Sequence, residues 1–106
     1  MKLQSFNWQA PNPLEFEWDP AKAQANLCKH RVTFDYTTDV FQDPNRIERP
    51  DEGDHDGEER WQVIGRVEEF VLMVVFTPRS DLTRIISARR ATHNELIEYW
   101  NGQVSV

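Results

Sequence analysis

Residues 61–76 read WQVIGRV, EE and FVLMVVF in turn, so two segments rich in apolar residues flank a pair of acidic residues. Its last seven residues, Phe70 to Phe76, form the longest apolar run of the chain and suit a central strand covered on both faces. A two-residue turn at Glu68-Glu69 would place Trp61 opposite Phe76. We therefore predict an antiparallel hairpin with strands over 60–67 and 70–77.

The two faces of this hairpin differ in charge. One face carries only apolar side chains, namely Trp61, Val63, Val67, Phe70, Leu72, Val74 and Phe76. The other face receives Arg60 and Arg66. A third strand over 82–90, joined by a four-residue loop at 78–81, would place Val75 opposite Arg84 and add Arg84 and Arg90 to that face. A one-residue change in the loop would send the arginines of the third strand to the opposite face.

Four arginines amid apolar residues on one sheet face are costly unless an anion or water meets them. In one interpretation, Glu and Asp side chains from the helices or from an acidic loop pair with them structurally. In the other, arginine forks bind the nonbridging oxygens of a phosphodiester and stabilise developing charge. The residues by themselves leave both interpretations open.

A strand and a helix precede the hairpin. Alternation predicts a strand over 14–18, and Asp19-Pro20 starts a helix that runs to about His30. Asp can cap the helix, and Pro tolerates its first position because the missing N–H would be unpaired there. One face of this helix holds Ala21, Ala25 and Cys28, while another displays Lys22, Asn26, Lys29 and His30.

The remaining elements complete a single domain. We predict a second helix from near Asp35 to Asp43-Pro44, a short strand over 46–48 and an acidic loop over 50–59. A capping box of Thr92 and Glu95 starts a last helix to about Trp100. The elements predict an α+β fold, a small antiparallel sheet packed with about three helices. The domain spans 14–101, between an N-terminal arm over 1–13 and a C-terminal tail over 102–106.

Length and composition narrow the class of protein. With 106 residues and one cysteine, the chain supports one compact domain and no internal disulfide. The apolar run is far shorter than the ~20 residues of a membrane-spanning helix, and no secretory signal opens the chain. We expect a cytoplasmic protein.

The net charge of −6 is unevenly distributed. Residues 43–59 hold eight acidic and two basic side chains, and the rest of the chain is balanced. Residues 79–90 hold four arginines and one acidic residue. A local cationic surface of this kind can bind phosphate despite the negative total.

Two histidines raise questions of chemistry. His30 is the best acid/base candidate because imidazole titrates nearest neutral pH, although a histidine there can equally cap the last carbonyls of its helix. His55 lies in Asp54-His55-Asp56-Gly57, which invites a metal interpretation. A calcium loop with Gly57 at position six would require a Glu where Val63 stands. We predict neither a metal nor another cofactor.

Ordered motifs run through most of the chain, over roughly residues 14–100. They are Phe16-x-Trp18-Asp19-Pro20-x-Lys22, Asn26-x-x-Lys29-His30, Phe34, Val40-Phe41, Asp43-Pro44, Glu59-Arg60, Gly65 and Arg84-Ile85-Ile86-Ser87-Ala88-Arg89-Arg90-Ala91. In this order they resemble the BrnT-type toxins of bacterial toxin–antitoxin systems. The resemblance implies a RelE-like compact ribonuclease that inhibits translation and is neutralised by a cognate antitoxin. Such antitoxins typically carry a DNA-binding portion, so the complex can repress its own operon.

The resemblance also points to particular side chains. They are Lys22, Lys29, His30, Arg60, Arg84, Arg89 and Arg90. Arg31 is a departure, since such proteins usually have Gly after Lys-His. Glycine favours the left-handed conformation that ends a helix, whereas arginine is sterically disfavoured in it.

Our functional hypothesis is metal-independent RNA cleavage, in which the 2′-hydroxyl attacks the neighbouring phosphorus. We expect His30 to transfer a proton and Arg60, Arg84 and Arg90 to bind phosphate and stabilise charge. The RNA backbone would be held by Lys22, Lys29, Arg66 and Arg89. RNA and an antitoxin are the expected partners, with operator DNA reached only through the antitoxin and no membrane involved. The alternative is a non-catalytic binding module whose basic face docks an acidic protein.

Overall fold

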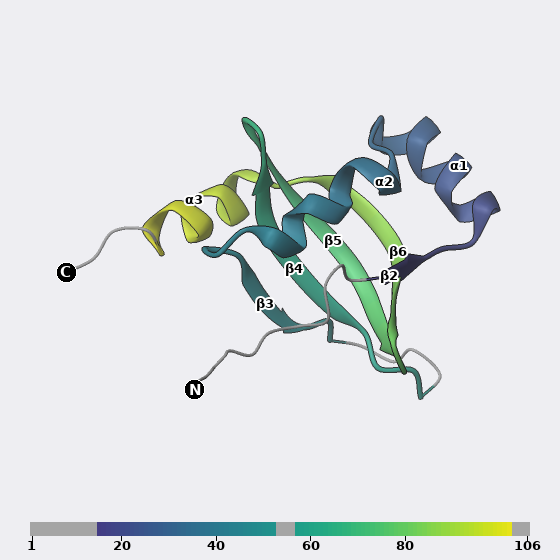
Figure 1. Ribbon diagram of the computed structural model, residues 1–106. Helices are drawn as coiled ribbons and strands as arrows, with labels where there is room; N and C mark the ends of the chain where they lie inside the picture. Colours follow the sequence, from purple (N-terminus) through teal and green to yellow (C-terminus); the bar gives the residue numbers. More distant parts are fainter. Residues whose placement is uncertain (1–14, 53–56, 103–106) are drawn as a thin grey trace, which may run out of the picture.

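The computed structural model describes residues 15–52 and 57–102 (Figure 1). Along the chain it contains β2 (Glu15–Glu17), α1 (Pro20–His30), α2 (Phe34–Thr37), the 3-10 helix η1 (Thr38–Gln42), β3 (Ile47–Pro50), β4 (Trp61–Val67), β5 (Phe70–Arg79), β6 (Leu82–Arg90) and α3 (His93–Asn101). The predicted arm, the tail beyond Gly102 and the motif at 54–56 lie outside the described residues.

The strands form one five-stranded sheet in the order β2-β6-β5-β4-β3. The four strands from β3 to β6 are antiparallel to their neighbours. Strand β2 instead runs parallel to β6, with Glu17 beside Arg84. The α+β class is therefore confirmed, while the sheet is mixed rather than wholly antiparallel, because β2 joins the edge of β6 in the same direction.

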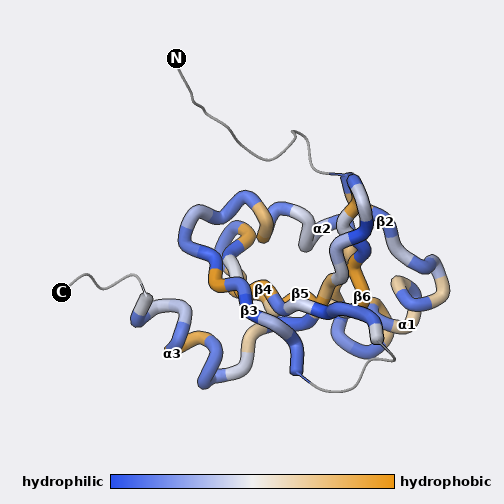
Figure 2. Tube along the Cα trace, turned by 90° about the horizontal axis from the view of Figure 1, so that it is seen from below, coloured by the Kyte–Doolittle hydropathy of each residue, from blue (hydrophilic) through white to orange (hydrophobic). Residues whose placement is uncertain are grey.

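The sheet has two apolar faces with different covers (Figure 2). On the face that we call the α2 face, α2 and η1 bury Phe34, Val40 and Phe41 against Val63, Leu72, Val74, Phe76, Ile85 and Ala88. On the opposite α3 face, Tyr99 of α3 packs on Ile64, Val71, Met73 and Val75. Strand β5 is buried from both sides, as its apolar run predicts.

One glycine allows this layering. A Cβ at Gly65 would lie 2.9 Å from Cγ1 of Val40, which is nearer than real Cβ atoms approach. The absence of a side chain on β4 therefore lets η1 pack directly on the strand.

The register of β4 and β5 is the one predicted, with Trp61 opposite Phe76 and Val67 opposite Phe70. The register of β5 and β6 is different. Arg79 pairs with Leu82, so the loop has two residues instead of four, and Thr77 rather than Val75 lies opposite Arg84. A two-residue difference leaves Arg84 on its predicted face, opposite the Trp61, Val74 and Phe76 core.

A register shift between β5 and β6 turns Arg90 to the face opposite the predicted one. The register shifts between Val75 and Phe76, whose partners are Ser87 and Ile85. This single extra residue in β6 inverts the alternation beyond it. Arg90 therefore lies opposite Leu72 on the α2 face, and the prediction that it shares a face with Arg60, Arg66 and Arg84 is wrong.

Helix α1 begins as predicted, with the Asp19 carboxylate accepting a hydrogen bond from the Ala21 N–H at 2.8 Å. Its predicted orientation is wrong. Ala21, Ala25 and Cys28 are exposed, whereas Asn26 is buried. The small residues supply little apolar area, and the buried amide finds backbone partners along β6.

Candidate functional site

One buried amide attaches α1 to the edge of β6. Asn26 accepts a hydrogen bond from the Ala88 N–H at 3.1 Å and donates to the Ala88 carbonyl at 2.9 Å and the Val32 carbonyl at 3.1 Å. Among the described strands, none pairs with this edge of β6 at Ala88, since β2 reaches only Arg84. Asn26 therefore takes the place of a strand and fixes the end of α1 beside Arg89-Arg90.

The end of α1 collects positive charge. Lys29 and His30 lie in its last turn, and Arg31 follows as the cap. Arg31 has φ 62° and ψ 31°, and its N–H donates to the Leu27 carbonyl at 2.9 Å. This is the left-handed conformation expected at the position after Lys-His. Cations here are favoured by the negative end of the helix dipole, and Lys29 and Arg31 extend into solvent.

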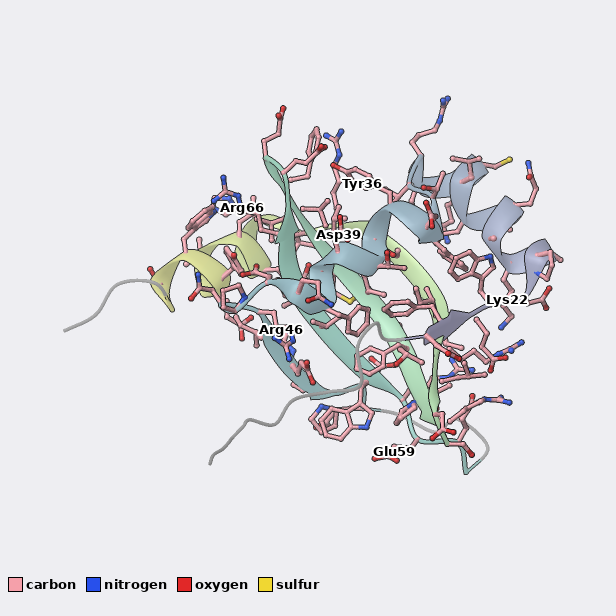
Figure 3. All side chains as sticks on the ribbon, in the orientation of Figure 1. Lys22, Tyr36, Asp39, Arg46, Glu59 and Arg66 are labelled. Carbon is pink, nitrogen blue, oxygen red and sulfur yellow. The ribbon has the colours of Figure 1, made fainter. Side chains whose placement is uncertain are left out.

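Next to this helix end lies a groove of about 280 Å³, which we call the α1 groove. It is lined by Arg31, Val32, Thr33, Tyr36, Phe70, Leu72 and Arg90. The Arg90 guanidinium lies over the Phe70 ring, 4.6 Å from its centroid. The Tyr36 hydroxyl donates to the Glu68 carboxylate at 2.8 Å, near the β4–β5 turn (Figure 3). Burial and that hydrogen bond raise the pKa of Tyr36, so its hydroxyl stays protonated near neutral pH.

The described arginines fall into two groups by their partners. Arg60 pairs with Glu58 at 3.2 Å, Arg84 with Glu17 at 3.4 Å and Arg89 with Glu95 at 2.8 Å. By contrast, no carboxylate among residues 15–52 and 57–102 forms an ion pair with Arg31, Arg66 or Arg90. Arg66 lies over Trp100, whereas Arg31 and Arg90 line the α1 groove. The α1 groove is therefore bordered by cations whose charge the described residues leave uncompensated.

The structure divides the predicted site residues. Lys29 and His30 directly precede Arg31 in the chain, and Arg31 and Arg90 line the α1 groove, whereas Lys29 and His30 are not among its lining residues. Lys22 lies near the start of α1, away from Tyr36 (Figure 3). The others lie elsewhere: Arg60 and Arg84 flank Thr77 near the β5–β6 turn, Arg89 contacts α3, and Arg66 lies over Trp100 at 5.8 Å.

Sequence reasoning missed three contributors to the site. The sequence pattern predicts Asn26 on an outer face of its helix and Phe70 only in the core, and it gives Tyr36 no role. Tyr36 follows the capping Thr33 by three residues, and nothing in the linear pattern links it to a strand more than thirty residues away. The one signal in the sequence that could have pointed to Tyr36 is that it is an aromatic residue close to Lys29-His30.

Two further observations concern sites of other kinds. In the described part of the chain, no group of three or more His, Cys, Asp or Glu side chains is arranged to hold a metal ion. None of the described helices is long and apolar enough to cross a membrane.

Comparison with known proteins relates most of the chain to a family. The family model for the ribonuclease toxin BrnT of type II toxin–antitoxin systems matches residues 18–95. The matched part runs from Trp18 into the first turn of α3 and contains every predicted site residue. No curated protein matches the chain.

Proposed function

The chain belongs to the BrnT family of ribonuclease toxins of type II toxin–antitoxin systems, and on this premise we propose that it cleaves RNA at the α1 groove. The observation that carries the proposal is the position of Arg31 and Arg90, which border the groove without a carboxylate among the described residues. Guanidinium groups in this state are suited to bind phosphate oxygens in a bidentate manner. His30 directly precedes Arg31 and supplies an imidazole, a side chain that can donate or accept a proton.

In the proposed reaction, the 2′-oxygen of a ribose bonds to the adjacent phosphorus and the 5′-oxygen leaves. The products carry a 2′,3′-cyclic phosphate and a 5′-hydroxyl. The attacking hydroxyl loses a proton and the leaving oxygen gains one, and we assign His30 to one of these transfers. Arg90 stabilises the charge that develops on the nonbridging oxygens. The nucleophile belongs to the RNA and the positive charge to arginine, so this mechanism requires no metal.

The remaining cations receive different roles. Lys29 and Arg31 hold the RNA backbone beside the groove, and Lys22 extends the same helix surface. We assign Arg60 and Arg84 to the β5–β6 end of the sheet, where Glu58 and Glu17 compensate their charge. Arg66 and Arg89 serve contacts with α3.

The test is incubation of the purified, antitoxin-free protein with single-stranded RNA in excess EDTA. We expect cleavage, and at least a 100-fold lower rate for Arg90→Ala and for His30→Gln, because charge stabilisation and proton transfer each contribute about 10²–10⁴-fold. Arg46→Ala is the matched control, since Arg46 is an exposed arginine paired with Glu48 away from the groove. Thermal unfolding verifies that each variant is folded.

Three results would contradict the proposal. Intact RNA both in EDTA and in Mg²⁺ would favour the non-catalytic module. Cleavage in Mg²⁺ alone would reject the metal-independent mechanism. Cleavage of RNA whose 2′-hydroxyls are methylated would exclude the 2′-oxygen as nucleophile.

We also propose that a cognate antitoxin neutralises the protein by covering the α1 groove. Acidic side chains can imitate phosphate and would compensate Arg31 and Arg90. The toxin would act in the cytoplasm as a RelE-like inhibitor of translation and would reach operator DNA only through the antitoxin.

Antitoxin affinity for Arg90→Ala and Arg46→Ala at low and high salt tests this surface. We expect Arg90→Ala to weaken binding by about tenfold at low salt and less at high salt, because exposed charge pairs are screened. Equal affinities of the two variants at both salt concentrations would place the antitoxin elsewhere.

A further inference from the structure

The α1 groove combines an apolar floor, aromatic walls and a cationic rim. Val32 and Leu72 are buried beneath it, and Tyr36 and Phe70 are half-buried at its sides. Arg31 and Arg90 complete the lining. An unstacked nucleobase is a flat apolar ring joined to a charged phosphate, and proteins hold such bases on aromatic side chains or on guanidinium planes.

The volume of the groove restricts the size of the ligand that can fit. Its volume of about 280 Å³ lies just below the range of about 300–1,000 Å³ typical of small-molecule sites, so it accommodates one nucleotide-sized group. A base within a duplex is stacked on its neighbours and cannot enter. A nucleobase that enters this groove would therefore have to come from a single strand.

The geometry of both aromatic walls is fixed by partners. Phe70 contacts the Arg90 guanidinium at 4.6 Å, so ring and cation are held together at one side. At the other side the Glu68 carboxylate accepts a hydrogen bond from the Tyr36 hydroxyl at 2.8 Å. Glu68 has φ 55°, a left-handed conformation that residues with a Cβ rarely adopt. This conformation belongs to the first residue of the two-residue turn between β4 and β5, and from that turn the Glu68 carboxylate reaches the Tyr36 hydroxyl.

We infer that the α1 groove binds one unpaired nucleobase of RNA, with Tyr36 as its stacking wall, Arg90 joining base and phosphate, and Glu68 positioning Tyr36. This inference rests on the proposed function because it takes RNA as the ligand. Stacking of a base on Tyr36 would then contribute to RNA binding in addition to the charges of Arg31 and Arg90.

The test measures binding rather than cleavage. Wild-type protein and the variant Tyr36→Leu are titrated with a short single-stranded RNA whose 2′-hydroxyls are methylated, which blocks the proposed reaction. Leucine keeps an apolar side chain but removes the ring. We expect Tyr36→Leu to weaken binding at least fivefold, since stacking on one aromatic side chain contributes about 1–3 kcal/mol per base, which corresponds to a factor of about 5–150. Tyr36→Phe keeps the ring but loses the hydrogen bond to Glu68, so we expect it to bind more weakly than wild type and more tightly than Tyr36→Leu.

Trp100→Ala is the matched control. Trp100 is an exposed aromatic residue that also contacts an arginine, Arg66, but it lies on α3. We expect this variant to bind like wild type. The second probe is an abasic strand with the same number of phosphates, for which we expect weaker binding and no effect of Tyr36→Leu. A urea titration confirms that each variant is folded.

The outcomes separate this inference from the proposed function. If wild type cleaves RNA but Tyr36→Leu binds the methylated strand as well as wild type does, the nucleobase site is wrong and the ribonuclease proposal stands. The same conclusion follows if Tyr36→Leu weakens the abasic strand equally, or if wild type binds a duplex as tightly as a single strand. If wild type binds the methylated strand as expected but cleaves no RNA, the site stands and the proposed reaction is wrong. Absence of binding by wild type overturns the inference.

Discussion

Two consecutive arginines show how the two faces of the sheet differ. Arg89 points to the α3 face, where Glu95 accepts two hydrogen bonds from it at 2.8 and 3.0 Å. Arg90 points to the α2 face and lies over Phe70, with no carboxylate partner among the described residues. On one face the positive charge is used to hold a helix, and on the other it remains available to an anionic ligand.

The attachments of the two helices follow the same division. Helix α3 is held by charged groups, with Glu95 on Arg89, Glu98 on Arg49 and the Tyr99 hydroxyl on Asp43 at 2.6 Å. Helix α1 is held by the neutral amide of Asn26. A neutral attachment leaves the cations at the end of α1 without an internal counter-ion.

The largest expected effect on stability comes from removing that amide. Asn26→Ala should lower the free energy of unfolding by about 2–4 kcal/mol, because the buried N–H and carbonyl of Ala88 lose their partner. Urea unfolding at low and high salt measures the loss, which should be the same at both because no charge is involved.

Gln24→Ala is the control for this prediction, since Gln24 is exposed on the same helix. We expect it to change stability by no more than about 0.5 kcal/mol. A loss below about 1 kcal/mol for Asn26→Ala, or one that depends strongly on salt, would show that α1 is held by something other than this amide.

The β4–β5 hairpin was predictable because two constraints agree. The charge-free set from Trp61 to Phe76 fits only one register, and a two-residue turn at Glu68-Glu69 gives the same one. The β5–β6 pair lacks this redundancy. Its turn at Ser80-Asp81 puts Ser80 at φ 46°, and the extra residue in β6 leaves no mark in the alternation. The predicted loop is two residues too long, which leaves the predicted face of Arg84 correct, whereas the extra residue in β6 turns Arg90 to the other face.

The site was less predictable than the fold because tertiary contacts define it. The motif Asn26-x-x-Lys29-His30 identifies the important helix, but the burial of Asn26 depends on an edge of β6 that the sequence does not reveal. The division of arginines into compensated and uncompensated ones depends on pairing with Glu58, Glu95 and Glu17. Glu58 and Glu95 are near their arginines in sequence, but Glu17 reaches Arg84 only because β2 joins the edge of β6.

An intermediate effect is expected on the α3 face. Glu95→Gln should lower the free energy of unfolding by about 1 kcal/mol at pH 7, since it removes a partly exposed charge pair while an oxygen remains for the capping box. The hydrogen bonds from Arg89 lower the pKa of Glu95 in the folded protein. The stabilisation is therefore fully present above the unfolded pKa of about 4.3 and is lost as the pH falls through the folded pKa.

The measurement is urea unfolding of wild type and Glu95→Gln at pH 7 and at about pH 3. The difference between the two proteins should shrink at the lower pH and at high salt. Glu48→Gln is the control, because Glu48 is exposed and pairs with Arg46 outside both helices. A difference that stays constant with pH would mean that the charge of Glu95 does not hold α3.

The smallest expected effect concerns the backbone at the end of α1. Arg31→Gly should raise the free energy of unfolding by about 0.5–1 kcal/mol, because glycine adopts φ 62° without steric cost. Arg31→Ala removes the same charge but keeps a Cβ, so it should bring no such gain. Thermal and urea unfolding of the two variants isolate the contribution of the strained conformation.

Binding of the methylated single-stranded RNA gives the second half of this test. Both variants lose the cation at the rim of the α1 groove, so both should bind more weakly than wild type and to the same extent. Higher stability of Arg31→Gly together with weaker RNA binding by both variants would mean that Arg31 destabilises the end of α1 and supplies a charge that contacts the RNA. Equal stabilities of the Gly and Ala variants would show that the left-handed conformation at residue 31 has no steric cost for a residue with a Cβ. Undiminished RNA binding by both would show that the uncompensated charge of Arg31 does not contact the RNA, and the contrast between the two faces would then rest on Arg90 alone.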